Sequence, residues 1–178
     1  MKKTLLSIAL ALGFSTAQAG WISYDVDQVK ADAKDDKDST AHYFRAGFDA
    51  LGMNNMIQAR TASFNGGGMV HSVEVTSGKA IGVVTPFIGI GHDLGYNGAK
   101  SFEYGLIGAS TGMKLGPIYA FMGGKTRLNF NDTNPKQTVG FLGVSYPVNK
   151  SVSVSAGYSK SIQDIKETST GLGIRIAF

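Results

Sequence analysis

The chain has 178 residues, with 17 lysines and arginines against 13 aspartates and glutamates, 24 glycines, four prolines and no cysteine. The lack of cysteine excludes disulfide bonds and thiolate metal sites. The small net charge, with no run of basic residues, gives no support for nucleic-acid binding. After residue 19 no apolar stretch approaches the roughly 18 residues of a spanning helix, so a helical membrane protein is excluded. Abundant glycine with little proline fits close-packed strands better than a disordered chain.

The first 19 residues have the pattern of an export signal. Lys2 and Lys3 form a basic start, an apolar run covers 4–14, and Ala-Gln-Ala at 17–19 is a small-residue cleavage site. The apolar run is shorter than the roughly 20 residues that a spanning helix needs. We therefore expect residues 1–19 to be a cleavable signal peptide and residues 20–178 to form one exported domain.

Beyond residue 19 the chain divides into ten segments with the two-residue alternation of β-strands. The pattern is clearest near the C-terminus, where Val152, Val154, Ala156 and Tyr158 alternate with serine and glycine. The connections alternate between short stretches and longer polar ones, as in a barrel with short periplasmic turns and longer outer loops. In chain order the predicted strands are 20–29, 41–50, 54–64, 69–76, 80–91, 101–112, 116–128, 137–147, 151–159 and 169–178.

The sequence therefore predicts an all-β protein, an antiparallel up-and-down transmembrane β-barrel. Closure is required because every backbone N–H and C=O inside a membrane must find a partner within the sheet. An even number of strands places both ends of the domain on the periplasmic side. Residues 41–58 leave an alternative open, since Phe44, Phe48 and Leu51 also fit one face of a helix. Ten strands are favoured, and eight strands after an irregular N-terminal segment are the alternative.

Charged residues test the alternation, because an ionised group facing lipid near the midplane costs about 2–4 kcal/mol. In most strands the charged residues lie opposite the apolar row; Glu103, for example, lies opposite Phe102, Tyr104 and Leu106. Since these charges balance, we expect a lumen closed by mutual pairing rather than a wide pore. The predicted lumen charge network comprises Asp25, Asp27, Arg45, Asp49, Arg60, Glu74, Glu103, Lys125, Arg127 and Arg175.

Catalytic and metal sites find little support. His92 and Asp93 lie where a strand meets an outer loop, with Ser101 and Ser110 nearby in sequence, so a lipid-hydrolysing site is conceivable. No nucleophile elbow or lipid A deacylase signature accompanies them, and capping of the strand end in a solvated loop is the favoured interpretation. The three histidines have no metal-ligand spacing. We predict no enzymatic activity, no metal and no cofactor.

Two stretches carry a resemblance to known proteins. The segment 152–160 and the ending 171–178, Gly-Leu-Gly-Ile-Arg-Ile-Ala-Phe, resemble the last hairpin of small outer-membrane barrels of the Ail/OmpX/opacity type. Phe178 resembles their barrel-assembly signal, and 86–91 resembles their aromatic-glycine strands. The resemblance implies eight strands, loops used in adhesion or complement resistance, and no cofactor. The apparent extra N-terminal hairpin and the short loops depart from that pattern.

The predicted protein is a monomer of the cell outer membrane. Its partners are outer-membrane lipid, lipopolysaccharide and the barrel-assembly machinery, and nucleic acid is not among them. The predicted role is structural or one of surface interaction. A narrow diffusion channel and, less favoured, an outer-leaflet lipid-modifying enzyme are the alternatives.

Overall fold

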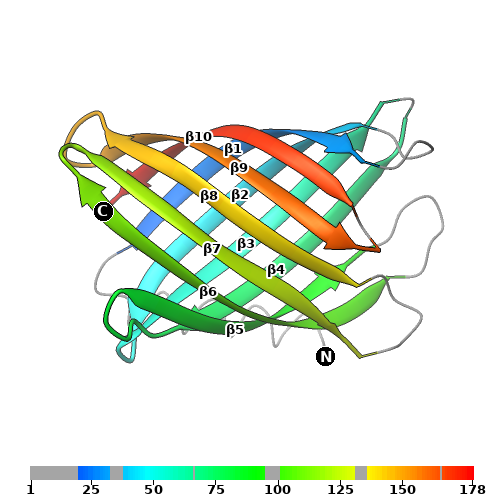
Figure 1. Ribbon diagram of the computed structural model, residues 1–178, viewed down its shortest axis with the longest axis horizontal. Helices are drawn as coiled ribbons and strands as arrows, with labels where there is room; N and C mark the ends of the chain where they lie inside the picture. Colours follow the sequence, from blue (N-terminus) through cyan, green and yellow to red (C-terminus); the bar gives the residue numbers. More distant parts are fainter. Residues whose placement is uncertain (1–19, 33–37, 66, 95–100, 131–135, 165) are drawn as a thin grey trace.

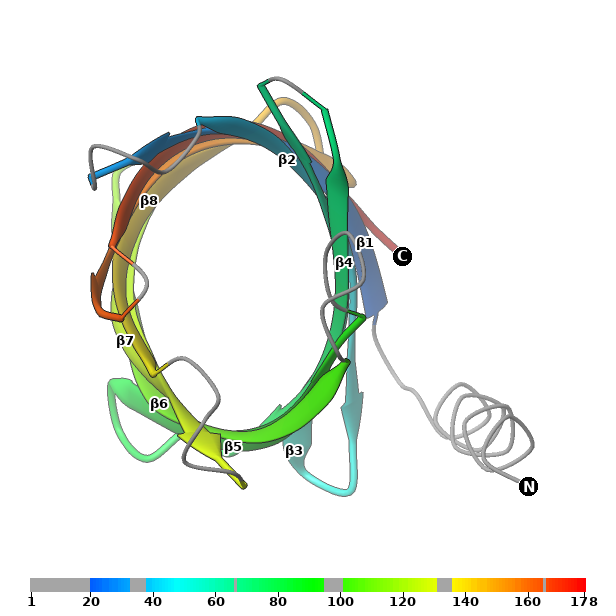
Figure 2. The same ribbon diagram turned by 90° about the vertical axis from the view of Figure 1, so that its right-hand side faces the viewer.

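The computed structural model describes residues 20–32, 38–65, 67–94, 101–130, 136–164 and 166–178, and the predicted signal peptide lies outside them. The described residues form ten antiparallel strands in one closed barrel, seen from the side in Figure 1 and end-on in Figure 2. None of these residues belongs to a helix long and apolar enough to cross a membrane. The strands are β1 (Gly20–Ala31), β2 (Ser39–Ala50), β3 (Met53–Phe64), β4 (Met69–Gly78), β5 (Val84–Asp93), β6 (Phe102–Leu115), β7 (Ile118–Asn129), β8 (Gln137–Pro147), β9 (Val152–Gln163) and β10 (Glu167–Ala177).

The favoured count of ten strands is confirmed, and the eight-stranded alternative is wrong. Residues 41–58, which also fitted a helix, are two strand segments: 41–50 lie in β2, between β1 and β3, and 53–58 open β3 after a two-residue turn. β5 begins at Val84 rather than at residue 80, because Ile81 and Val84 exchange backbone hydrogen bonds of 2.8 and 3.3 Å across a turn at Gly82. β9 continues to Gln163, beyond its predicted end at 159.

The ring closes where the first strand meets the last. β1 and β10 pair in register from Trp21 opposite Ala177 to Ala31 opposite Glu167. Two further backbone hydrogen bonds extend this seam. The nitrogen of Gly20 lies 3.1 Å from the oxygen of Phe178, and the nitrogen of Phe178 lies 2.9 Å from the oxygen of Gly20. Each strand therefore has two hydrogen-bonded neighbours, so no sheet edge is left to face lipid.

The two ends of the barrel differ. The turns after β2, β4, β6 and β8 lie at the same end as the C-terminus (Figure 1). Two of them have only two residues, and the one between β2 and β3 has positive φ at both, Leu51 at 56° and Gly52 at 71°, as in a type I′ hairpin turn. β1, β5 and β7 end at the opposite end of the barrel, and the connections that follow these strands are the longest in the chain. By the rule for transmembrane barrels, the short turns face the periplasm.

Apolar side chains cover the outside of the barrel. Ile88, Ile90 and Leu172 are 64, 65 and 71 % exposed, although each lies well inside a strand. Similar residues occupy the outward rows of most strands, and we call this surface the exterior belt. Exposed leucine and isoleucine in the middle of a closed barrel fit contact with hydrocarbon and do not fit contact with water. The fold is therefore that of a transmembrane barrel.

The exterior belt can be tested with paired arginine substitutions. Leu172 lies in the middle of β10, whereas Phe130 follows the outer end of β7 and is 69 % exposed. We expect Leu172→Arg to lower the free energy of unfolding by about 2–4 kcal/mol, and Phe130→Arg by at most about 1 kcal/mol, because the cost of a lipid-facing charge falls towards the interface. Urea titration in lipid vesicles, followed by the fluorescence of the single tryptophan, measures both. Equal losses would contradict the placement of β10 across the hydrocarbon.

Candidate functional site: the polar lumen

The inward rows of the barrel carry a large part of its charge. Strand register places nine members of the predicted network on these rows, where they line the lumen. They contact one another mainly along the wall formed by β1 to β7. The nine are Asp25, Asp27, Arg45, Asp49, Arg60, Glu74, Lys125, Arg127 and Arg175.

Glu74 of β4 is the centre of these contacts. Its side chain is only 3 % exposed and binds groups from three other strands. The Tyr104 hydroxyl donates to Oε1 at 3.0 Å, and the Gln58 amide donates to Oε2 at 3.2 Å. Lys125 donates to Oε2, and Nη2 of Arg127 lies 4.0 Å from Oε1. The buried carboxylate is therefore satisfied by two cations and two neutral donors.

Glycine on β5 makes this convergence possible. Gly91 stands in register between Glu74 and Tyr104, which lie on the two neighbouring strands. A Cβ at Gly91 would overlap the Tyr104 ring, so any larger residue would displace the ring. The missing side chain lets Tyr104 lie across β5 and reach the carboxylate of Glu74.

The contacts continue from β3 back to β1. Nε of Arg45 donates to Oε1 of Gln58 at 2.7 Å, and Nη1 of Arg45 donates to Oδ2 of Asp25 at 2.5 Å. Because Gln58 also binds Glu74, the path from Asp25 to Lys125 is continuous. We call the five residues of this path the lumen network: Asp25, Arg45, Gln58, Glu74 and Lys125.

Further inward contacts involve aromatic rings. The guanidinium groups of Arg127 and Arg175 lie 4.3 and 4.1 Å from the ring centroids of Tyr104 and Trp21. Nε of Arg60 donates to the Tyr43 hydroxyl at 3.2 Å. The first two distances are within the range of cation–π contacts, so ring faces help to hold Arg127 and Arg175 in the lumen.

The strand next to β1, β10, carries small inward residues. Asp27 accepts a 2.6 Å hydrogen bond from Ser169 of β10. A Cβ on Gly171 or Gly173 of β10 would overlap the carboxylate of Asp27 or Asp25. The carboxylates of β1 therefore occupy the space that glycine and serine leave on the neighbouring strand β10.

Glu103 was predicted to face the lumen, and this prediction is wrong. Its side chain is 66 % exposed and lies 3.9 Å from Nδ1 of His92 on the outward face. Tyr104 and Leu106, predicted to face lipid, point inward and are 0 and 2 % exposed. Glu103 is the second residue of β6, at its outer end, where an outward charge costs only about 0–1 kcal/mol. The hydrogen bond from Tyr104 to Glu74 favours the observed orientation of the strand.

The structure does not bring together the residues considered for a lipid-hydrolysing site. His92 faces outward beside Glu103, whereas Asp93 lies on the inward row and is 9 % exposed. Ser110 is also on an inward row, so the barrel wall separates it from His92. Capping by His92 and Asp93 in a solvated loop is likewise corrected, because Asp93 is buried. Among the described residues, no group of three histidine, cysteine or acidic side chains is placed to hold a metal ion.

The neutral members of the site, Gln58 and Tyr43, do not follow from the charge pattern of the strands. Gln58 and Tyr43 carry no charge, yet each links two charged groups. Both have the sequence parity of a predicted inward residue on the same strand, Arg60 for Gln58 and Arg45 for Tyr43. That parity predicts that both side chains face the lumen, since residues two apart on a strand face the same side.

Neither a protein-family model nor a curated protein matches the chain. Among solved structures, the β domain of the Bordetella autotransporter BrkA gives a TM-score of 0.53 at 12 % identity, covering 89 % of this chain and 98 % of that chain. Neisserial surface protein A gives 0.49 at 15 % identity, covering 90 % and 99 %. The KdgM porin gives 0.47 at 7 % identity, covering 89 % and 99 %. At these identities the comparison with BrkA shows the fold alone. Together with the apolar exterior belt and the polar lumen, the closed ring makes this chain an integral β-barrel protein of the outer membrane.

Proposed function

We propose that this protein is a non-conducting barrel with a structural or surface-interaction role, offering its outer loops to the medium. Burial in the outer half of the lumen carries the proposal. Every strand contributes an inward residue there whose side chain or whole residue is at most 9 % exposed, including Tyr104 of β6 and Arg127 of β7. Side chains lining a water-filled pore would be hydrated. The corresponding residues of the other eight strands are Val29, Ser39 and Ala41, Ala62, Ser72, Asp93, Gln137, Ser161 and Ser169.

The charges of the lumen network support the same proposal. The carboxylate of Glu74 is paired with Lys125 and approached by Arg127, and that of Asp25 is paired with Arg45. A site of mutually paired charges presents no excess sign to a passing ion, and separating the pairs would leave buried charges uncompensated. The network therefore favours a sealed interior over a selective pore.

A narrow diffusion channel is the second candidate. Inward residues of the inner half are wetter than those of the outer half: Tyr119 is 44 % exposed, and Ser153 and Ser155 are partly exposed. In the favoured proposal this region is a vestibule open only to the periplasm. An enzymatic role has no comparable support, since His92 and Ser110 lie on opposite faces of the wall.

The proposal includes the predicted partners. The protein acts as a monomer surrounded by outer-membrane lipid and lipopolysaccharide, and the barrel-assembly machinery recognises Phe178. The aromatic side chain of Phe178 is 74 % exposed and its backbone belongs to the β1–β10 seam. An exposed terminal ring beside the closing seam is accessible before closure is complete.

Planar-bilayer recordings test the closed lumen. We expect folded wild-type protein to give no discrete current steps. The double variant Tyr104→Ala/Leu106→Ala should give steps, because it removes two large side chains that are almost fully buried in the lumen. A shift in gel mobility between unboiled and boiled samples establishes folding of both proteins. Discrete steps from the wild type would reject the closed lumen in favour of the channel.

Substitutions at Glu74 test the lumen network. Glu74→Gln leaves Lys125 without its buried carboxylate, so we expect a loss of about 3–5 kcal/mol in the free energy of unfolding. Glu103→Gln is the matched control on the outward face and should change that free energy by less than about 0.5 kcal/mol. The double variant Glu74→Gln/Lys125→Met should recover part of the loss. Urea unfolding in vesicles measures all three, and equal effects of Glu74→Gln and Glu103→Gln would reject the central role of Glu74.

A further inference from the structure

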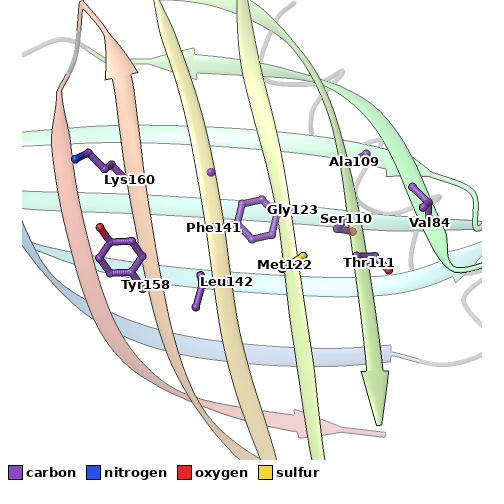
Figure 3. A pocket seen from close by; sticks show the side chains of 11 residues that line it. Val84, Ala109, Ser110, Thr111, Met122, Gly123, Phe141, Leu142, Tyr158 and Lys160 are labelled. Atoms are coloured by element: carbon purple, nitrogen blue, oxygen red, sulfur yellow. The ribbon is translucent and has the colours of Figure 1, made fainter. Parts of the chain in front are cut away.

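The exterior belt contains a hollow that the lumen does not explain. A shallow groove of about 510 Å³ crosses β6 to β9 on the lipid-facing surface (Figure 3). Apolar atoms form almost all of its lining. Figure 3 shows Lys160 and Tyr158 at one end of the groove and Val84 at the other. The described part of the chain therefore has a concave site on a surface that membrane lipid must cover.

Strand register builds the floor of the groove. Ala109, Gly124 and Gly140 stand in register on β6, β7 and β8, and all three face outward. The next outward row is Thr111, Met122, Leu142 and Tyr158, of which Met122 and Leu142 are 56 and 51 % exposed. A row of small residues beside a row of large ones leaves a channel perpendicular to the strands. With about 4.8 Å between strands, it extends for about 14 Å from β6 to β9.

A cation stands at the outer end of this floor. Lys160 of β9 is in register with Gly140, and its side chain is 55 % exposed. The residue lies near the outer end of β9, within reach of the interface for a side chain that extends its ammonium group out of the hydrocarbon. Its ion pair with Asp32 is long, 3.9 Å, so the ammonium group keeps donors for another anion.

We propose that this groove binds an acyl chain of a phosphate-bearing anionic lipid of the outer leaflet, with the lipid phosphate paired to Lys160. A chain lying in the groove contacts its floor and both sides, and so gains more dispersion contacts than a chain against a flat wall. The cation at the outer end fixes which end of the lipid lies there. The inference depends on the barrel spanning the membrane, and holds whether the lumen is closed or open.

Lipid A is the probe, and native mass spectrometry of the folded full-length protein in nonionic detergent is the readout. We expect one lipid A adduct on the wild type. Gly140→Leu fills the floor, and a Cβ at this position meets no heavy atom within 4 Å, so the variant should fold. It should bind lipid A about tenfold more weakly, because each methylene group excluded from the groove costs several-fold in affinity.

Lys160→Gln tests the phosphate contact and should weaken binding about threefold, the value of one exposed ion pair. Ala46→Leu is the matched control: it adds a similar side chain to the outward row of β2, away from the groove, and should leave binding unchanged. Gel mobility of unboiled samples establishes that every variant is folded.

Three results would overturn the inference. Equal binding by Gly140→Leu and the wild type would remove the groove as the site. Binding of zwitterionic phosphatidylcholine as tightly as lipid A would remove the role of Lys160. Wild-type dimers that Gly140→Leu abolishes would show that a second copy of the chain, rather than lipid, occupies the groove.

Discussion

The whole structure depends on backbone hydrogen bonds that close a ring of strands in a solvent unable to replace them. The pairing of β1 with β10 completes that ring. Because hydrocarbon offers no partner to an unpaired N–H or C=O, closure leaves each strand with two fixed neighbours. Register then decides the direction of every side chain, since a slip of one residue would exchange the two faces of a strand. The lumen network and the exterior belt are both consequences of this one constraint.

Inside the ring, packing depends on where side chains are missing. Gly91 lets Tyr104 reach Glu74, and the glycines of β10 leave room for the carboxylates of β1. A larger residue at any of these positions would push a charged or hydroxyl group away from its partner. Burial of the partners would then make the loss expensive, because a buried polar group that has lost its partner costs about 1–3 kcal/mol. Glycine on the inward rows is therefore as much a part of the polar site as Glu74 itself.

The sequence predicted the ten strands and most inward charges, because the lipid solvent forces apolar and charged residues of a strand onto opposite faces. It failed at β6, where a polar residue at the rim can face outward at little cost and apolar Leu106 can fill the lumen. The same weakness hid Asp93 as a lumen residue. The groove could not be predicted from the sequence for another reason. Its floor comes from three strands, and only their register brings Ala109, Gly124 and Gly140 together.

The two faces of the wall at the groove are filled in different ways. On the inside, the ring of Phe87 occupies the space beside Gly108, and the ring of Phe141 occupies the space beside Gly123. The next residue along each strand, Ala109 on β6 and Gly124 on β7, faces out, and no side chain of the described chain fills the space above the row they form. The wall is thus thin at one place, with aromatic side chains packed on the lumen side and a hollow on the lipid side. Since a void in an apolar surface forfeits dispersion contacts, the proposed acyl chain would restore them by filling the hollow. The protein supplies its own filling where no lipid can enter, and leaves space where lipid is always present.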